Sequence, residues 1–166
     1  MRSRLFWVIL GVAIGAAAYG GKVLATPSVG FTGKTLAKAT FPEIYSHVHT
    51  VPAYWDELIK TKGDSDLYVQ QNTWQPGGST GWHTHPGPSL IIVTQGTVTE
   101  YDGDDPSCTP HVYSANGTSS FVDIGGGSVH LIRNESDAVA QTVAVQLVPA
   151  GAVRREDAPD PGTCSF

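Results

Sequence analysis

Three histidines of this chain have the residue type and spacing of a metal site. His83 and His85 are two positions apart, and His130 follows much later in the chain. Residues i and i+2 of a β-strand point to the same face of a sheet, so His83 and His85 would share one face. A histidine on a neighbouring strand adds a third neutral nitrogen, a ligand type that suits zinc, copper, iron and nickel. The sequence therefore predicts a divalent transition-metal centre at these histidines.

The composition indicates a single β-rich domain. The chain has 166 residues, with 19 glycines, 11 prolines and only 15% charged residues, which is typical of short strands joined by turns. Its formal net charge is -5 and its pI is about 5.6. No basic run follows the N-terminal region, so the sequence argues against nucleic acid as a partner.

Strand signals recur along most of the chain. Alternating or β-branched runs separated by Gly and Pro turns predict strands at 35–41, 66–74, 89–94, 97–101, 111–114, 120–124, 128–133 and 138–148. Residues 55–60 are too few to distinguish a helical turn from a strand. Gln95-Gly96 is expected to form a hairpin turn between its two flanking strands. This pattern predicts a sandwich, a barrel or a jelly roll.

The three histidines lie in two spaced motifs that resemble those of the cupin superfamily, G-x5-H-x-H-x3,4-E-x6-G and G-x5-P-x-G-x2-H-x3-N. The matching positions are Gly77, His83, His85 and Gly96 in the first motif (77–96), and Gly127, His130 and Asn134 in the second (119–134). The resemblance implies an all-β, cupin-type jelly-roll β-barrel that occupies residues 26–166.

The sequence departs from the cupin pattern at three positions. Ser119 and Gly125 replace the glycine and the proline of the second motif, where neighbouring glycines can supply the turn. Ser89 stands where the first motif has glutamate. The chain thus resembles the three-histidine cupins, which include thiol and diketone-cleaving dioxygenases and bind substrate directly at Fe(II) or another divalent ion. Three imidazoles leave the charge of the ion uncompensated and a coordination position open.

The resemblance implies a dioxygenase-like or other metal-dependent enzyme that acts on a small anionic or enolisable molecule. The alternative is a barrel that binds metal or a small ligand without turnover, or one that is purely structural. Iron is implied by the dioxygenase resemblance, whereas the general affinity order favours copper and zinc for a protein that loads its metal outside the cell. The sequence leaves Fe, Zn and Cu open.

Candidate pocket residues accompany the metal ligands. Gln70 and Asn72 share one face of the strand at 66–74, which either lines the barrel or forms a polar outer face. Ser89 either hydrogen-bonds a bound ligand or is inert packing. Glu100 and Tyr101 are the acid–base candidates nearest the motifs.

The three remaining histidines are interpreted as structural. His47 and His49 share a strand face and are either a second metal patch or, as is more common, surface histidines. His111 also fits a structural role, close to Cys108.

The N-terminus and the cysteines predict an extracytoplasmic protein. Arg2 and Arg4 precede the apolar run 5–19, so residues 1–25 have the layout of a secretory signal peptide or of a retained membrane-anchor helix. Cys108 and Cys164 are an even pair and are expected to form a disulfide. The protein would be secreted or anchored to the membrane by this segment alone, with a small-molecule ligand or substrate as its partner, and a homodimer is left open.

Overall fold

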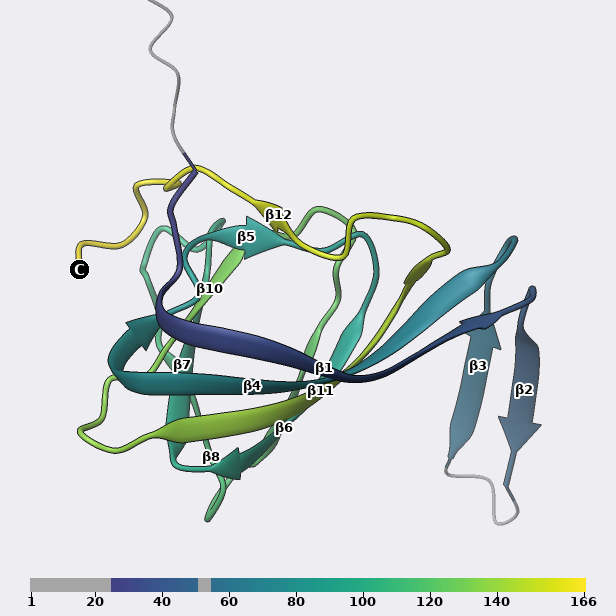
Figure 1. The fold of residues 1–166 in the computed structure, drawn as a ribbon, viewed down its shortest axis with the longest axis horizontal. Coiled ribbons are helices and arrows are strands. Elements are labelled where there is room, and N and C mark those ends of the chain that lie inside the picture. Colours follow the sequence, from purple (N-terminus) through teal and green to yellow (C-terminus); the bar gives the residue numbers. More distant parts are fainter. Residues whose placement is uncertain (1–24, 51–54) are drawn as a thin grey trace, which may run out of the picture.

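The computed structural model describes residues 25–50 and 55–166, which form an all-β fold (Figure 1). The strands in these ranges are β1 (Val29–Phe41), β2 (Tyr45–His49), β3 (Asp56–Lys60), β4 (Ser65–Ser79), β5 (His83–Thr84), β6 (Ser89–Gln95), β7 (Thr97–Asp102), β8 (His111–Ser114), β9 (Ser120–Asp123), β10 (His130–Arg133), β11 (Ala140–Pro149) and β12 (Glu156–Asp157). The predicted signal peptide or anchor lies outside the described residues, apart from Ala25. Over the described ranges, the chain has no helix that is long and apolar enough to cross a membrane.

The strands form a jelly-roll barrel from two groups that face each other. Strands β1, β4, β11, β6 and β9 are neighbours in one group, and β12, β5, β10, β7 and β8 are neighbours in the other. The end of β4 joins the groups, because Ser79 pairs with Arg133 of β10. The predicted all-β, cupin-type barrel is confirmed.

Alternation along the strands separates a core from a polar cavity. The apolar side chains that point inward form one buried cluster of Trp74, Ile91, Val93, Val98, Phe121, Ile132, Ala140 and Ala144. Polar inward residues continue along the same strands, so that Gln70 of β4 and Thr142 and Gln146 of β11 are also buried. The barrel is thus apolar at the core cluster and polar where the histidines lie.

The prediction of a hairpin at Gln95-Gly96 is wrong. Strand β6 pairs with β11 and β9, whereas β7 pairs with β10 and β8. Gly96 has a φ of 68°, and a Cβ there would lie 2.7 Å from the carbonyl oxygen of Val139. The turn therefore carries the chain from one strand group to the other at a closely packed corner that only glycine fits.

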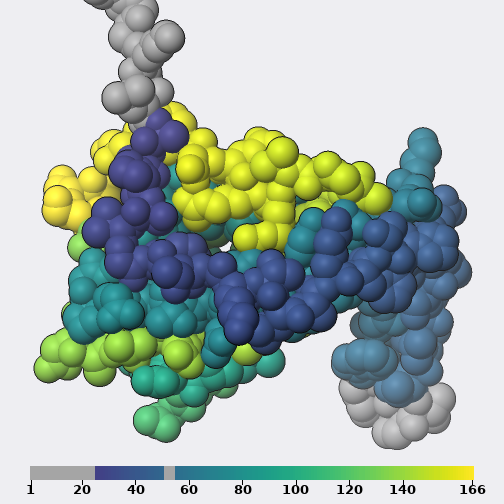
Figure 2. Space-filling view, in the orientation of Figure 1, coloured from purple at the N-terminus to yellow at the C-terminus, as the bar shows by residue number. Residues whose placement is uncertain are grey.

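Residues 56–60 form a strand, which settles the ambiguity over 55–60. This strand, β3, pairs with β2 in a separate two-stranded sheet. Figures 1 and 2 show that this hairpin projects from one end of the barrel. It carries several exposed apolar side chains, among them Tyr45, Val48, Leu58 and Ile59.

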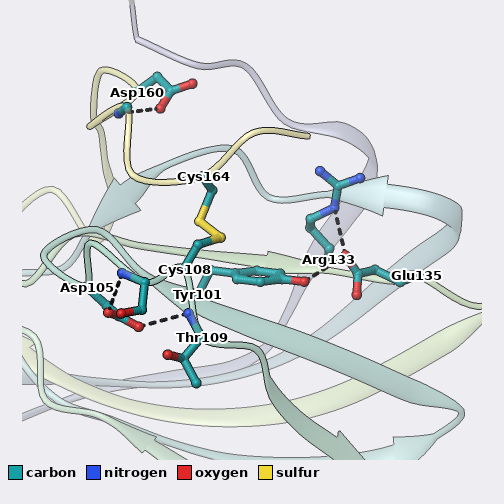
Figure 3. Close-up of a disulfide and its surroundings, with 10 residues drawn as sticks. Tyr101, Asp105, Cys108, Thr109, Arg133, Glu135, Asp160 and Cys164 are labelled. Carbon is teal, nitrogen blue, oxygen red and sulfur yellow. Dashed lines mark hydrogen bonds and ion pairs between the residues drawn. A yellow bond between two sulfur atoms is a disulfide. The ribbon is translucent and has the colours of Figure 1, made fainter.

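The C-terminal segment covers one side of the barrel and is covalently fixed there. The predicted disulfide is present between Cys108 and Cys164, which are 56 residues apart (Figure 3). Cys164 packs in a second buried cluster with Trp82, Tyr101 and Leu131. Trp82 and Tyr101 therefore pack outside the barrel cavity.

Removing this disulfide should destabilise the domain substantially. The chain-entropy relation for a loop of this length predicts a loss of about 4 kcal/mol in the free energy of unfolding for Cys108→Ser/Cys164→Ser. Urea unfolding with and without reductant measures this loss. Wild-type protein under reducing conditions should match the double variant, and equal stability of the oxidised and reduced wild type would contradict the expectation.

Candidate metal centre

The barrel brings the three predicted histidines together. His83 begins β5, His85 follows that strand, and His130 begins β10 directly opposite His83 in the antiparallel pair. Each histidine offers one ring nitrogen, and these three atoms all lie within 4.8 Å of one another. The i, i+2 spacing and the cross-strand pairing together produce one compact donor set.

Backbone carbonyl oxygens orient all three imidazole rings. The Nδ1 atoms contact the carbonyl oxygens of Gly81 for His83 (2.9 Å), Arg154 for His85 (2.7 Å) and Ser128 for His130 (3.4 Å). A carbonyl oxygen only accepts hydrogen bonds, so each Nδ1 must carry the proton and donate it. The Nε2 atoms are then left with free lone pairs, which is the arrangement that metal-binding histidines require.

The environment also keeps these rings neutral. Burial lowers the pKa of His83 well below its usual 6.5, with further lowering by the nearby His130 and Arg155. Burial lowers the pKa of His85 to about 4 and lowers that of His130, although Asp123 opposes both shifts. Near neutral pH the three side chains are therefore unprotonated at one nitrogen and ready to bind a cation.

A carboxylate that the sequence analysis did not identify lies beside the histidines. Asp123, on β9, is only 4% exposed. Its Oδ2 lies 3.8 Å from the Nε2 of His85, and its Oδ1 lies 3.8 Å from the Nδ1 of His130. Asp123 thus adds a carboxylate beside the three imidazoles, which the sequence analysis did not expect.

Ser89, which stands at the glutamate position of the cupin-like first motif, connects Asp123 to β6. Ser89 and Asp123 are register partners across β6 and β9, and the Ser89 hydroxyl donates to Asp123 Oδ2 at 3.3 Å. Gln146 Nε2 donates to the same hydroxyl at 3.1 Å, and Arg154 Nη1 donates to Gln146 Oε1 at 3.3 Å. Ser89 is thus a link in a buried chain from Arg154 to Asp123.

The histidines line a small cavity that Gln70 and Asn72 also line, on the inner face of β4. Ser89 lines it as well, together with Gln146, Arg154 and Arg155. Gln70 Nε2 donates to Asn72 Oδ1, and Asn72 Nδ2 donates to Thr142 Oγ1. Gln70 Oε1 is buried and has no hydrogen-bond partner among the described residues.

A second, acidic pocket lies on the other side of His130. It is lined by Glu100, Asp102, His111, Tyr113, Asp123 and His130, together with Val122, Ile124 and Ser128. Burial, followed by the charges of Asp102 and Asp123, raises the pKa of Glu100 from 4.5 to about 7. The Tyr101 hydroxyl instead donates to Glu135 at 2.9 Å, outside both pockets (Figure 3). Neither acid–base candidate lines the histidine cavity.

The remaining histidines lie apart from this cavity. His47 and His49 belong to the projecting hairpin, and neither lines the cavity. His111 is exposed on β8, with its Nε2 3.6 Å from Asp102 Oδ2. The described cavity therefore contains three of the six histidines of the chain.

Comparison with known proteins finds solved structures that are similar at low sequence identity. No protein-family model matches the sequence, and no curated protein matches it. The polyketide cyclase RemF from Streptomyces resistomycificus has 16% identity over 84% of this chain and 81% of that chain, with a TM-score of 0.50. A cupin domain from Bordetella pertussis (16% identity, 75% of this chain and 97% of that chain) has a TM-score of 0.44. A cupin superfamily protein from Desulfitobacterium hafniense (10% identity, 69% and 81% coverage) has a TM-score of 0.42.

At these identities the similarity concerns the fold. The barrel topology and the placement of both motifs on adjoining strands define the chain as a protein of the cupin fold. Its histidine cluster is of the kind that holds a divalent metal, with no glutamate at position 89.

Replacing Glu100 should change how stability depends on pH. The folded-state pKa of about 7 lies above the ordinary 4.5, so the stability that protonated Glu100 contributes is complete below 4.5 and is lost as pH rises through 7. Relative to wild type, Glu100→Gln should gain on the order of 3 kcal/mol between about pH 4 and about pH 8.

Urea unfolding of metal-free protein at the two pH values measures this gain. Glu156→Gln, at an exposed position of β12, is the control. Identical pH dependence of the two variants would show that Glu100 has an ordinary pKa.

Proposed function

We propose that this protein is an exported cupin that holds a divalent transition metal through His83, His85 and His130 and acts there on a small anionic molecule. The observation that carries the proposal is the convergence of three buried, neutral imidazoles whose Nδ1 atoms are all fixed by backbone carbonyls. In this tautomer each Nε2 keeps its lone pair, so a cation bound there would have three nitrogen donors.

The position and charge of Arg154 support the proposal of an anionic ligand. Arg154 lines the cavity, its guanidinium donates to Gln146, and it forms no ion pair with a carboxylate among the described residues. Its partial burial lowers the pKa of the guanidinium below the usual value. Arg155, by contrast, is already paired with Asp157 and donates to the carbonyl oxygen of Thr80. Arg154 is therefore the cation that a bound carboxylate or enolate would meet.

The size of the cavity limits the ligand. The space open to the centre of a water molecule is about 60 Å³, and roughly 10–15 Å³ of such space holds one water. The cavity thus accepts about four to six waters, or a ligand of comparable size. A small organic acid fits this limit, while a long chain or a nucleotide does not.

A bound divalent ion would supply Lewis-acid polarisation of a carbonyl or carboxylate and, for a redox metal, access to dioxygen chemistry. Arg154 would orient the anion, and the apolar walls Trp74, Ile91 and Ile132 would exclude water from it. Asp123, held by Ser89 and by the backbone N–H of Gly125 at 2.8 Å, would keep a negative charge beside the donor set. Fe, Zn and Cu all accept this ligand set.

A second function, binding without turnover, is favoured by one observation. Among the described residues that line the cavity there is no carboxylate, and the ionisable ones are the three histidines, Arg154 and Arg155. A general base would therefore have to be a ligand histidine or Asp123 just behind them. Oxygen uptake with a panel of enols, thiols and diketones separates the two functions, since a binder consumes none.

We also propose that the barrel works outside the cytoplasm. The disulfide between Cys108 and Cys164 is compatible with an oxidising compartment. The leader-like sequence of residues 1–25 supports export, as a cleaved signal or a retained anchor. A homodimer, which the sequence leaves open, stays open.

Metal content tests the donor set. Tag-free protein should bind one equivalent of divalent metal that resists dialysis, and His83→Ala/His130→Ala should lose it. Asp123→Asn should weaken retention by about 10- to 100-fold, the usual effect of losing a group that supports metal ligands. Elemental analysis after dialysis against a chelator measures both, with His111→Ala as the control. Unchanged metal content in the double variant would rule out this site.

The affinity of the protein for small carboxylates tests the proposed role of Arg154. Replacing it with glutamine should raise the Kd of the metal-loaded protein for small carboxylates by about 10-fold or more, because a partly buried charge-assisted contact is lost. Metal content should not change. Arg133→Gln, which removes an equal charge outside the cavity next to Glu135, should bind carboxylates as wild type does. Equal weakening by both variants would point to general electrostatics and not to a contact.

A further inference from the structure

The projecting hairpin carries a second set of metal-ligating side chains. His47 and His49 lie on β2, and Asp56 is the first residue of β3. His49 and Asp56 are direct cross-strand partners, and His47 lies two residues along the same strand face. One nitrogen from each histidine and one oxygen of Asp56 all lie within 4.8 Å of one another.

The two separations that involve Asp56 are those of ligands around one ion. Asp56 Oδ1 lies 3.1 Å from His47 Nε2 and 3.0 Å from His49 Nδ1. The two imidazole ring centres are 4.3 Å apart. Neighbouring ligands with metal bonds of about 2.1 Å lie about 3.0 Å apart at right angles and about 3.4 Å apart in a tetrahedron. The carboxylate oxygen is thus already at ligand spacing from both nitrogens.

Hydrogen bonds alone give this arrangement little stability. Without an ion, the contact of His47 with Asp56 Oδ1 has the geometry of a hydrogen bond, whereas that of His49 is a short distance alone, and all three side chains are exposed to solvent. Exposed pairs of this kind contribute about 0–1 kcal/mol. Strands β2 and β3 pair only with each other over the described residues. Because an isolated two-stranded sheet is marginally stable in water, the hairpin requires a further stabilising interaction.

We propose that His47, His49 and Asp56 bind one divalent first-row transition ion, separate from the barrel centre. An ion held by two β2 histidines and one β3 carboxylate would link the two strands of the hairpin. Water would fill the remaining positions, because the exposed fractions of the His49 and Asp56 side chains are 67% and 61%. This site should therefore exchange its ion faster than the buried one, and should bind Cu²⁺ more tightly than Zn²⁺.

Binding stoichiometry tests the proposal. Calorimetric titration of tag-free, metal-free full-length protein with Zn²⁺ should give two equivalents for wild type. His47→Ala/His49→Ala should bind one and retain the slowly exchanging ion, while His83→Ala/His130→Ala should bind one and retain the rapidly exchanging ion. Asp56→Asn should weaken the rapidly exchanging ion by at least about 10-fold through loss of a charged ligand.

The matched control is His111→Ala, which removes another exposed histidine next to a carboxylate. It should still bind two equivalents. If His47→Ala/His49→Ala binds as many ions as wild type, or if His83→Ala/His130→Ala binds none while its circular dichroism shows an intact fold, the hairpin site is overturned. Failure of the barrel centre has a different outcome, in which His83→Ala/His130→Ala loses no ion and the hairpin variant loses one.

Discussion

The hydrogen bonds from the three histidine Nδ1 atoms to backbone carbonyls are the constraint on which the site depends. A buried imidazole must satisfy its N–H, and the choice of partner decides which nitrogen remains a ligand. The three carbonyls come from the turn before β5, the turn before β10 and the C-terminal segment. The donor set therefore forms only when these separate segments are in place. Formation of the site thus depends on folding of the whole barrel.

The C-terminal segment has a particular part in this closure. It supplies the carbonyl of Arg154 to His85 and the guanidinium of the same residue to the cavity. Its position is fixed by the pairing of β12 with β5 and by the disulfide to Cys108. A covalent bond remote from the histidines thus helps to hold the His85 ring and the Arg154 side chain in place, which links stability to the proposed function.

The fold and the three histidines could be predicted from the sequence because their signals are local. Alternation along a strand and the i, i+2 spacing of His83 and His85 need no knowledge of partners. The turn at Gln95-Gly96 was mispredicted because the same residues suit a hairpin and a corner between sheets. Asp123 was missed because its importance comes from pairing with Ser89 across β6 and β9, and register between distant strands has no local signal.

Asp123 and Arg154 give the two ends of the site opposite charges. Arg154 and Asp123 stand at opposite ends of one hydrogen-bond chain, with Gln146 and Ser89 between them. In the proposed site, the guanidinium would attract the charge of a bound anion and the Asp123 carboxylate would repel it. A carboxylate on β9, with serine at position 89, would keep negative charge near a bound ion and leave the inner face of β6 free for a ligand. A serine at position 89 is what this arrangement requires, since its hydroxyl can accept from Gln146 and donate to Asp123, whereas a glutamate would place a second buried negative charge against the first.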